Sequence, residues 1–429
     1  MFKRIATFFA AALLMLAVGI GALLAFNLRG EAPLPEIAAP FQSSPAQIER
    51  GRYLALAGNC AGCHTTRGGA PFAGGLGIGT PFGTIYASNI TPQPQQGIGE
   101  WSSDHFWRAM HNGRSRDGHL LYPAFPYPSF TRLTREDSDA LYAFLRSVPP
   151  SDRQNTPHAL RFPYNTQLAL AGWRALFFKP GEFVPDPQRS AAWNRGAYLV
   201  QGPGHCVACH GARNAMGATI DGRGLAGAPV PGENWYAPSL SDIHEAGVAQ
   251  WPVKEIVALL GTGTAPRASV SGPMADVVWA STQHLDEADL TAIATYLREL
   301  PGTSSRALRG QEAGAGSRKA RDAATMARGA AIYDQRCAYC HGAQGEGQRG
   351  AFPPLAGRRA VTMEDPTNLV QVVRHGGYLP ATAGNPRPAG MPPFGQVLDE
   401  ADIAAVLTYI RASWGNDAPP VGLREAMKR

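Results

Sequence analysis

Several signatures of common protein classes are missing from this sequence. Its 429 residues carry a formal net charge of only +6 and no clustered basic stripe, so nucleic acid is not an expected partner. The glycine-rich string GGLGIG at 74–79 does not open a helix after a strand and therefore does not indicate a dinucleotide site. We find no other constellation typical of a catalytic centre. Chemistry on an organic substrate is therefore expected on another chain.

Cysteine is also scarce, and none lies outside a short motif. The strings CAGCH, CVACH and CAYCH contain Cys60, Cys63, His64, Cys206, Cys209, His210, Cys337, Cys340 and His341. A C-x-x-C-H string is the attachment signature of c-type haem, in which two thiols form thioethers and the next histidine ligates the iron. The two cysteines hold one edge of the macrocycle while the histidine is carried beneath it. The sequence therefore predicts three covalently bound haem c groups.

The motifs have other readings, which a single copy would leave open. A C-x-x-C pair also occurs in zinc sites, in redox dithiols and in disulfides. Three complete copies that each end in histidine favour haem. Because haem is attached in this way outside the cytoplasm, the motifs also indicate an exported chain.

The amino terminus contains a long stretch without charge. Ile5 to Phe26 is 22 residues long, and a helix of that length reaches roughly 33 Å, enough to cross the hydrocarbon core. Lys3 and Arg4 precede it, which favours a cytoplasmic amino terminus and haem domains on the periplasmic side of the inner membrane. The alternative is a cleaved signal peptide, for which GIG at 19–21 offers a weak cleavage site. The length favours an uncleaved anchor.

An internal repeat surrounds the three motifs. Helical patterns precede them (QIERGRYLALAGNC, AWNRGAYLVQGPGHC and MARGAAIYDQRC), and amphipathic patterns with acidic starts follow (LTREDSDALYAFLRSVP, LDEADLTAIATYLRELP and LDEADIAAVLTYIRASW). Each unit resembles the class I cytochrome c fold, so we predict a mainly α protein with three tandem domains. The predicted divisions are a membrane anchor or signal segment at 1–30, domains at 44–150, 190–302 and 325–416, an ordered linker at 151–189, and a flexible linker at 303–324.

Methionines in proline-bounded loops are candidates for the second axial ligand of the iron. Met391 follows the histidine of its motif by 50 residues, and Met274 follows its own by 64. A thioether ligand favours ferrous iron and raises the potential. The same count in the first unit reaches Phe125, 61 residues after its histidine, within LYPAFPYPSF. Phenylalanine cannot ligate iron, so the first haem is expected to lack a thioether ligand.

Three other side chains near this loop are candidates for the missing ligand. His119 precedes the loop and could swing inward. His111 and Met110 lie in a helical run, where one surface and one core residue are expected. The sequence does not decide which side chain, if any, is the sixth ligand of the first haem.

Longer strings are similar to those of the trihaem cytochrome c subunits of membrane-bound bacterial dehydrogenases. They are GTIYASNITP, LYPAFPYPSFT, RFPYN, PDPQRSAAWNRGAYLVQGPGHC and WYAPSL, and the similarity covers nearly everything after Pro45. That family generally has methionine where this chain has Phe125, and relatives that serve molybdenum hydroxylases carry phenylalanine.

The resemblance implies an electron carrier without substrate chemistry of its own. Electrons would come from a periplasmic dehydrogenase subunit, which is a quinoprotein, a flavoprotein or a molybdenum hydroxylase. They would leave to ubiquinone, a downstream cytochrome or an oxidase. Two alternatives remain open: a peroxidase-type haem enzyme with an open first haem, and a cytochrome subunit of a terminal oxidase.

Overall fold

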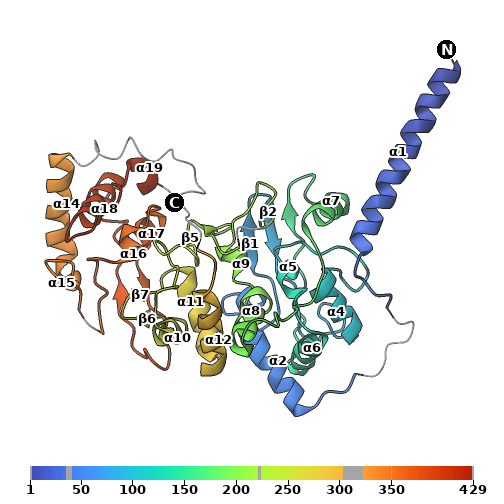
Figure 1. Cartoon of the computed structure of the whole chain (residues 1–429), viewed down its shortest axis with the longest axis horizontal. Coiled ribbons are helices and arrows are strands. Elements are labelled where there is room, and N and C mark those ends of the chain that lie inside the picture. Colours follow the sequence, from blue (N-terminus) through green and yellow to red (C-terminus); the bar gives the residue numbers. More distant parts are fainter. Residues whose placement is uncertain (1, 35–40, 221–223, 303–321, 349, 428–429) are drawn as a thin grey trace.

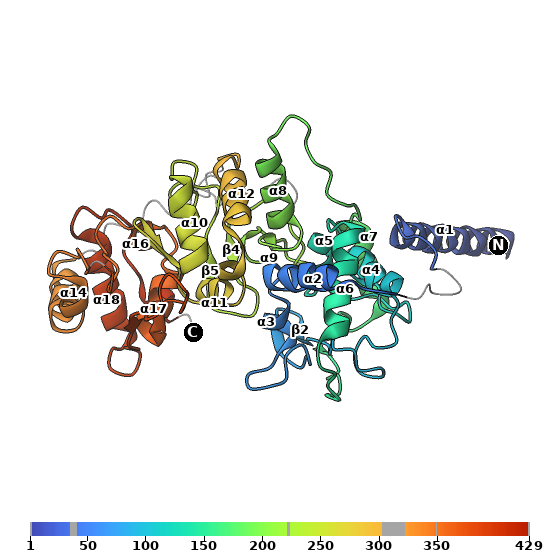
Figure 2. The same cartoon turned by 90° about the horizontal axis from the view of Figure 1, so that it is seen from below.

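The computed structural model describes residues 2–34, 41–220, 224–302, 322–348 and 350–427. The chain is elongated: helix α1 projects from one end, and the parts of the chain around α2 to α7, α8 to α12, and α14 to α19 follow one another toward the other end (Figure 1). A view turned by 90° shows the same succession (Figure 2). The motif-bearing units are thus arranged in a row rather than around one centre.

The described residues are mainly helical. The longer helices are α1 (Phe2–Leu28), α2 (Pro45–Ala57), α4 (Ser103–Asn112), α6 (Arg135–Ser147), α7 (Gln167–Phe177), α8 (Ala191–Gln201), α10 (Val253–Thr262), α11 (Pro273–Ala280), α12 (Glu287–Arg298), α14 (Ala323–Arg336), α17 (Thr367–His375) and α18 (Glu400–Ala412). Short turns are α3 (Cys60–His64), α5 (Tyr127–Phe130), α9 (Val207–His210), η1 (Thr282–His284), α15 (Ala338–His341), α16 (Arg359–Thr362) and α19 (Leu423–Ala426).

Strands are short throughout the described residues. They are β1 (Gly77–Thr80), β2 (Gly83–Tyr86), β3 (Ala159–Leu160), β4 (Ala228–Pro229), β5 (Tyr236–Ala237), β6 (Thr264–Ala265), β7 (Ala268–Ser269), β8 (Gly377–Tyr378) and β9 (Gly390–Met391). They form one antiparallel sheet of order β1-β2-β3 and three two-stranded ribbons. The predicted linker at 151–189 contains β3, which pairs with β2, and helix α7. Most of the predicted second linker, 303–321, lies outside the described residues.

The helices that flank each motif cross at a glycine. A Cβ built on this glycine would lie far too close to a carbonyl oxygen of the partner helix: Gly51 to Ala140 at 1.9 Å, Gly196 to Ala292 at 1.9 Å, and Gly329 to Ala405 at 2.3 Å. The crossings join α2 with α6, α8 with α12, and α14 with α18. The glycine of each Arg-Gly pair therefore lets the two backbones touch, which explains why the pair recurs before every motif.

The arginine of each pair reinforces the same crossing. It binds an aspartate in the first turn of the partner helix: Arg50 with Asp137 at 2.5 Å, Arg195 with Asp289 at 2.7 Å, and Arg328 with Asp402 at 2.7 Å. A capping residue one turn earlier, Thr134, Asp286 or Asp399, accepts the backbone N–H of that aspartate. The first residues of α6, α12 and α18 thus cap these helices and also bind the arginine of the helix that crosses each of them.

The first two units are packed together more closely by buried hydrophobic side chains than either is with the third. One cluster of buried side chains includes Leu54 and Leu133 of the first unit together with Leu199 and Ile256 of the second. A separate cluster around Tyr333 and other buried residues lies in the third unit. The first two units therefore share a core, whereas the third has its own.

Candidate haem sites

The histidine of each motif is held in one orientation by a backbone carbonyl. The distance from the imidazole Nδ1 to the carbonyl oxygen is 2.6 Å for His64 and Ser88, 2.7 Å for His210 and Pro238, and 2.9 Å for His341 and Pro353. A carbonyl only accepts hydrogen bonds, so the proton of the neutral ring lies on Nδ1. This arrangement leaves Nε2 as the ligand atom and is the usual way in which proteins orient a metal-binding histidine.

The backbone of the same histidines is fixed by a glycine. Each histidine carbonyl accepts an N–H, from Gly74 at 2.7 Å, Gly227 at 2.8 Å or Gly347 at 2.7 Å. These glycines have φ values of 73°, 82° and 67°, where other residues are strained. A Cβ at these positions would also lie 2.4, 2.6 and 2.6 Å from atoms of Ser88, Ser239 and Phe352. We call the carbonyl acceptor, the histidine and its glycine the histidine clamp.

Burial favours the neutral form of the three imidazoles. Loss of solvent lowers the pKa of His64, His210 and His341, although the accepting carbonyl partly opposes this shift. A neutral imidazole with a free Nε2 is the form that ligates iron. The histidine clamps thus supply the correct protonation state as well as the orientation.

Burial favours the protonated form of cysteines in all three motifs. Burial raises the pKa of Cys60 and Cys206 to about 12 and that of Cys337 to about 11, whereas metal and redox sites need thiolates. All six cysteines are free of disulfides. Among the described residues, no group of three or more His, Cys, Asp or Glu side chains could hold a metal ion. The residues present fit haem c, with thioether bonds from the cysteines and Nε2 of the histidine on the iron.

The loops toward the candidate axial ligands share a beginning. Helices α4, α10 and α17 end at Gly113, Gly263 and Gly376, with φ values of 60°, 78° and 67°. The chain then turns back through a bridge between Arg114 and Leu120, the ribbon β6-β7, or the ribbon β8-β9. The loop with Phe125 is therefore built like the two loops with methionine.

The two methionines occupy partly buried positions in these loops. Met391 ends β9 opposite Gly377 and packs on the cluster that Cys337 also contacts. Met274 lies in the first turn of α11 and packs on Val270, Ala275 and Val278. Their role as iron ligands stays a prediction.

Phe125 packs among aromatic side chains of its own loop. Its ring centroid lies 5.4 Å from that of Phe130 and 6.5 Å from that of Tyr127. Tyr127 is fully buried, and a Cβ on Gly113 would meet its ring at 2.5 Å. The prolines and aromatics of this stretch therefore form a packed turn against the end of α4.

Of the three candidate substitute ligands for the first haem, Met110 and His111 lie in the interior. Met110 belongs to the shared core. His111 is also buried, at 7% exposure, and stacks on Trp107 with ring centroids 4.4 Å apart. The expectation of one surface residue here was wrong, because Trp107 and the loop that carries Thr131 cover this side of α4. The His119 imidazole is half exposed and binds Asp117 at 2.5 Å.

The first and second motifs are joined by a hydrogen bond that the sequence did not reveal. Nε2 of His205, the residue before Cys206, donates to the carbonyl of Gly58 at 3.1 Å. Gly58 lies two residues before Cys60, and its carbonyl is free to accept because α2 has just ended. The backbones that carry the two motifs therefore meet.

The first two units also exchange tyrosine contacts. Tyr53 of α2 donates to Asp289 of α12 at 2.7 Å, and Tyr198 of α8 donates to Asp137 of α6. Tyr53 and Tyr198 occupy the same position, two residues after the crossing glycine, where the third unit has Ala331. The first two units thus form a reciprocal pair that the third does not extend in this way.

The third unit contacts the second through different residues. Asn368 of α17 accepts from the backbone N–H of Tyr236 at 2.9 Å and donates to its carbonyl at 2.8 Å. The Arg359 guanidinium donates to the Gly247 carbonyl at 2.6 Å and lies over the ring of Trp251. This contact is mostly polar and backbone-directed, consistent with the separate core of the third unit.

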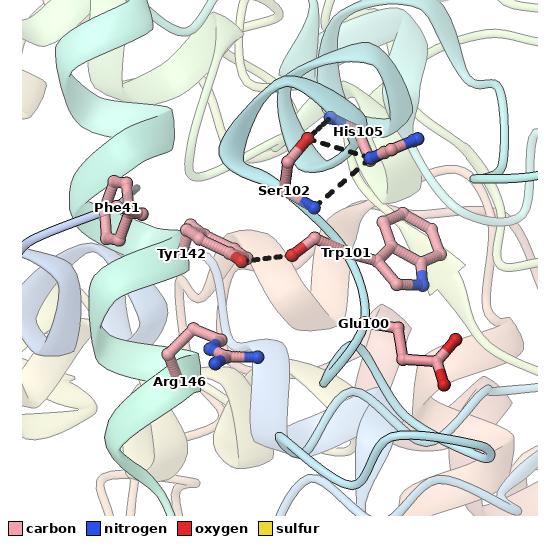
Figure 3. A pocket seen from close by; sticks show the side chains of 7 residues that line it. All are labelled: Phe41, Glu100, Trp101, Ser102, His105, Tyr142 and Arg146. Atoms are coloured by element: carbon pink, nitrogen blue, oxygen red, sulfur yellow. Dashed lines mark hydrogen bonds between the residues drawn. The ribbon is translucent and has the colours of Figure 1, made fainter. Parts of the chain in front are cut away.

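A cavity of about 300 Å³ lies on the first unit. Its lining comes from the start of α4, from α6 and from the segment before α2, and consists of Phe41, Glu100, Trp101, Ser102, His105, Tyr142 and Arg146 (Figure 3). Tyr142 donates to the Trp101 carbonyl, and Ser102 and His105 form the capping box of α4. These bonds serve the fold of the first unit, and none of the lining residues belongs to a haem motif.

Covalent attachment motifs on clamped histidines, within crossed helices, define a c-type cytochrome. Two family models match: "Cytochrome c" at residues 48–149 and "Cytochrome C oxidase, cbb3-type, subunit III" at residues 324–410. The cytochrome c subunit of alcohol dehydrogenase (quinone) from Gluconobacter oxydans is 40% identical, over 87% of this chain and 80% of that protein. The gluconate 2-dehydrogenase cytochrome c subunit from Pantoea cypripedii is 38% identical, over 88% of each chain. The chain belongs to the family of cytochrome c subunits of bacterial dehydrogenases.

A third relative is much longer than this chain. It is a nicotinate dehydrogenase subunit from Pseudomonas putida, 43% identical over 88% of this chain, but the match covers 31% of that protein. The chain thus corresponds to one part of that larger protein.

Proposed function

We propose that the chain is a three-haem electron relay of a periplasmic dehydrogenase complex. Family membership supports electron transfer rather than substrate chemistry. The observation that carries the count of three is the histidine clamp, which recurs at His64, His210 and His341 with the same donor and acceptor atoms. Bound haem iron alternates between the ferric and ferrous states and so carries one electron at a time.

Three tandem cytochrome c domains are the proposed architecture. The boundaries are those predicted from the sequence, at 44–150, 190–302 and 325–416. Support comes from the glycine crossing, the arginine–aspartate pair and the histidine clamp, each of which recurs around every motif. Met274 and Met391 are the proposed second axial ligands of the second and third haems, and the position of Phe125 denies the first haem an equivalent ligand.

The proposed location is the inner membrane, with the haem domains on the periplasmic side. The span Thr7–Leu28 is long and apolar enough to cross a membrane, with a mean hydropathy of 2.5. An uncleaved anchor is supported by the last turn of α1, which is bound into the folded body: Asn27 donates to the Ala171 carbonyl at 3.0 Å and accepts from Arg174 at 3.1 Å.

The proposed partners are a dehydrogenase catalytic subunit and a membrane acceptor. The relatives are named for alcohol, gluconate, fructose and nicotinate dehydrogenases, which supports a dehydrogenase subunit as the electron donor. The proposed classes of donor are a quinoprotein, a flavoprotein or a molybdenum hydroxylase. The proposed acceptor is ubiquinone, a downstream cytochrome or an oxidase. The peroxidase-type alternative is not favoured by these relatives.

Haem content and reducibility test the proposal together. The mass of the intact chain should exceed that of the polypeptide by three haem groups, and the purified chain alone should oxidise no alcohol, sugar or aldehyde. When its dehydrogenase and substrate are added, all three haems should become reduced. Fewer than three haems would refute the count, and substrate oxidation by the purified chain alone would refute the role of relay.

A further inference from the structure

We propose that helix α7 is a second membrane contact, which lies on the lipid surface beside the point where α1 leaves the bilayer. This inference rests on the proposed anchoring by α1 and adds a surface that the family assignment does not supply. The ligand is the headgroup and upper acyl region of the bilayer. The argument has three parts: the attachment of α7 to α1, the apolar face of α7, and the charges beside it.

Helix α7 is attached rigidly to the end of the membrane span. The two helices lie side by side at the base of α1 in both views (Figures 1 and 2). Asn27, one residue before the end of the span, is buried and bonds to both Ala171 and Arg174 of α7. Because Leu28 ends the apolar span, its neighbour α7 is held at the level of the membrane surface.

The segment after α1 is fixed to the same body. Arg114 binds Glu31 at 2.9 Å, and Asn112 donates to the Gly30 carbonyl at 3.2 Å. The Arg174 guanidinium also donates to the carbonyl of Asn112, so α7, α4 and the end of α1 form one network. The position of α7 relative to the bilayer is therefore set by side chains rather than by a free linker.

The face of α7 turned away from the body is apolar. Leu170, Arg174 and Phe178 are buried at every fourth position, so they mark the inner face. Leu168 and Leu176 lie on the opposite side and are 72% and 74% exposed, with Gly172 between them. Just before α7, Phe162 is 81% exposed. A helix with one buried polar network and one exposed apolar face at a membrane surface is typical of interfacial helices.

Aromatic and basic side chains flank this face. Trp173 packs against Phe177, with the two rings tilted and their centroids 5.7 Å apart, and donates its indole N–H to the Met216 carbonyl. Tryptophan is enriched at the membrane interface, where its apolar ring and polar N–H are both satisfied. Exposed Arg161 and Lys179 bracket the segment and suit anionic headgroups. These features favour lipid over an apolar protein partner.

A fluorescent label tests the contact in the full-length haem protein. Leu168→Cys and Leu176→Cys each add one thiol, which is the only reactive one because the six native cysteines are bound to haem. The variants are labelled with the environment-sensitive dye NBD and reconstituted into phosphatidylethanolamine–phosphatidylglycerol vesicles. Leu423→Cys, an exposed leucine in the third unit at the other end of the molecule, is the matched control.

The expected result is a blue shift of emission at positions 168 and 176, with strong quenching by lipids brominated near the headgroup. Position 423 should keep the emission of a water-exposed dye. Water-like emission at 168 and 176, with or without the dehydrogenase subunit, would overturn the proposal. A blue shift that appears only after the dehydrogenase subunit is added would also overturn it, because the surface would then be a protein interface.

Two readouts separate this proposal from the proposed function. A label at Leu14→Cys, inside α1, reports on the anchor when the vesicles contain lipids brominated deep in the acyl chains: if it is unquenched there while 168 and 176 are quenched by the headgroup-brominated lipids, the anchor fails and the α7 contact stands. If all three are unquenched, both fail. More than one reactive thiol per labelled chain would show that haem attachment, and hence the relay, is at fault. The double change Leu168→Glu/Leu176→Glu should retain haem content and reduction by the dehydrogenase, but abolish quenching of a label at Phe162→Cys.

Discussion

His205 and Gly58 connect the polypeptide of the first motif with that of the second. From Cys60 the chain runs through Asn59 to the Gly58 carbonyl, crosses a 3.1 Å hydrogen bond to His205, and reaches Cys206 one residue later. Few covalent bonds and a single hydrogen bond therefore separate the proposed attachment points of the first two haems. Their close approach makes exchange of electrons within the first pair of units the step most directly supported by the protein.

Replacing His205 should slow this exchange without removing haem. His205→Leu eliminates the donor, costs about 1 kcal/mol of stability for the lost hydrogen bond, and is expected to lower the rate of electron transfer between the first two haems several-fold. Flash-induced reduction followed by absorption kinetics measures this rate. His205→Gln, which keeps an N–H donor, should restore it. Equal rates in all three proteins would show that the bond is structural only.

Gly227→Ala should damage the second haem site. The alanine Cβ would lie 2.6 Å from the Ser239 backbone nitrogen at a residue with φ of 82°, so we expect a loss of roughly 1–3 kcal/mol and incomplete haem attachment. Gly68→Ala is the control, because Gly68 has a φ of 72° but open space around it. Thermal unfolding and haem content measure both effects. Equal damage in the two variants would assign the effect to backbone strain and not to the histidine clamp.

Met391→Leu and Met274→Leu should lower one potential each. Leucine nearly conserves volume, so packing should change by less than about 1.5 kcal/mol, whereas loss of the thioether removes the stabilisation of ferrous iron. Redox titration gives the potentials, and near-infrared magnetic circular dichroism reports the sulfur ligand. Met363, a buried methionine of the third unit, provides a control as Met363→Leu. Unchanged titrations would make Met274 and Met391 packing residues.

Phe125→Met should have the opposite effect on the first haem. The loop begins like the two methionine loops, so the new thioether is expected to reach the iron, add a sulfur signal and raise the lowest of the three potentials. In the unchanged protein, electron paramagnetic resonance of the ferric state should distinguish a bis-histidine from a five-coordinate first haem. Absence of both changes in the variant would show that this loop does not face the haem.

The carboxylate of Asp289 is bound by Arg195 and Tyr53, and its protonation should weaken the contact between the first two units at low pH. Burial alone would raise the pKa of Asp289, but hydrogen bonds from Arg195 and Tyr53 outweigh burial and hold this pKa below its usual range. The unfolded chain takes up the proton near the ordinary value of about 3.9. Stabilisation present at neutral pH is therefore lost as the pH falls through the lowered pKa of the folded state.

Asp289→Asn tests this dependence. The variant should be less stable at pH 7 by roughly 2–3 kcal/mol, because three hydrogen bonds to a charged group, two from Arg195 and one from Tyr53, are weakened. Its stability should fall less steeply below about pH 4. Asp402→Asn is the matched control: its partner Arg328 is half exposed, so the cost should be at most about 1 kcal/mol. Urea unfolding at several pH values measures both. Parallel acid slopes in wild type and Asp289→Asn would contradict the assignment.

Local patterns predicted the helices around the motifs well. The six amphipathic segments correspond to α2, α6, α8, α12, α14 and α18, because acidic caps and apolar spacing are local properties. The spacing of C-x-x-C-H likewise pointed to the three histidines that backbone carbonyls orient, and their role as iron ligands stays a prediction. Their accepting carbonyls follow the histidines at different separations, Ser88 after 24 residues and Pro353 after 12, so no fixed spacing could reveal them.

Contacts between units could not be predicted from the sequence either, because they join residues far apart in the chain. The Tyr53–Asp289 bond joins residues 236 positions apart. In the reciprocal contact, Tyr198 binds Asp137, and nothing in the sequence distinguishes this tyrosine from other residues of a helix. Helix α7 lies in the segment predicted only as an ordered linker, and the sequence did not reveal it because some of its apolar residues pack on the body while others are exposed. His111 was misjudged because periodicity assigns faces of a helix but does not show which faces later elements cover.

The reciprocal contacts of Tyr53 and Tyr198 bear on the direction of electron transfer between the first two units. Contacts that read Tyr53 to Asp289 in one sense and Tyr198 to Asp137 in the other are those that an approximate two-fold axis produces. A scaffold with such symmetry presents the same environment from either side and gives an electron no downhill direction of its own. The polarity of this half of the proposed relay must then come from side chains that break the symmetry, such as Phe125 at the position where the second unit has Met274. The scaffold of the first two units would favour neither direction of electron transfer. A single residue beside one iron would then set that direction, by making the potentials of the two haems differ.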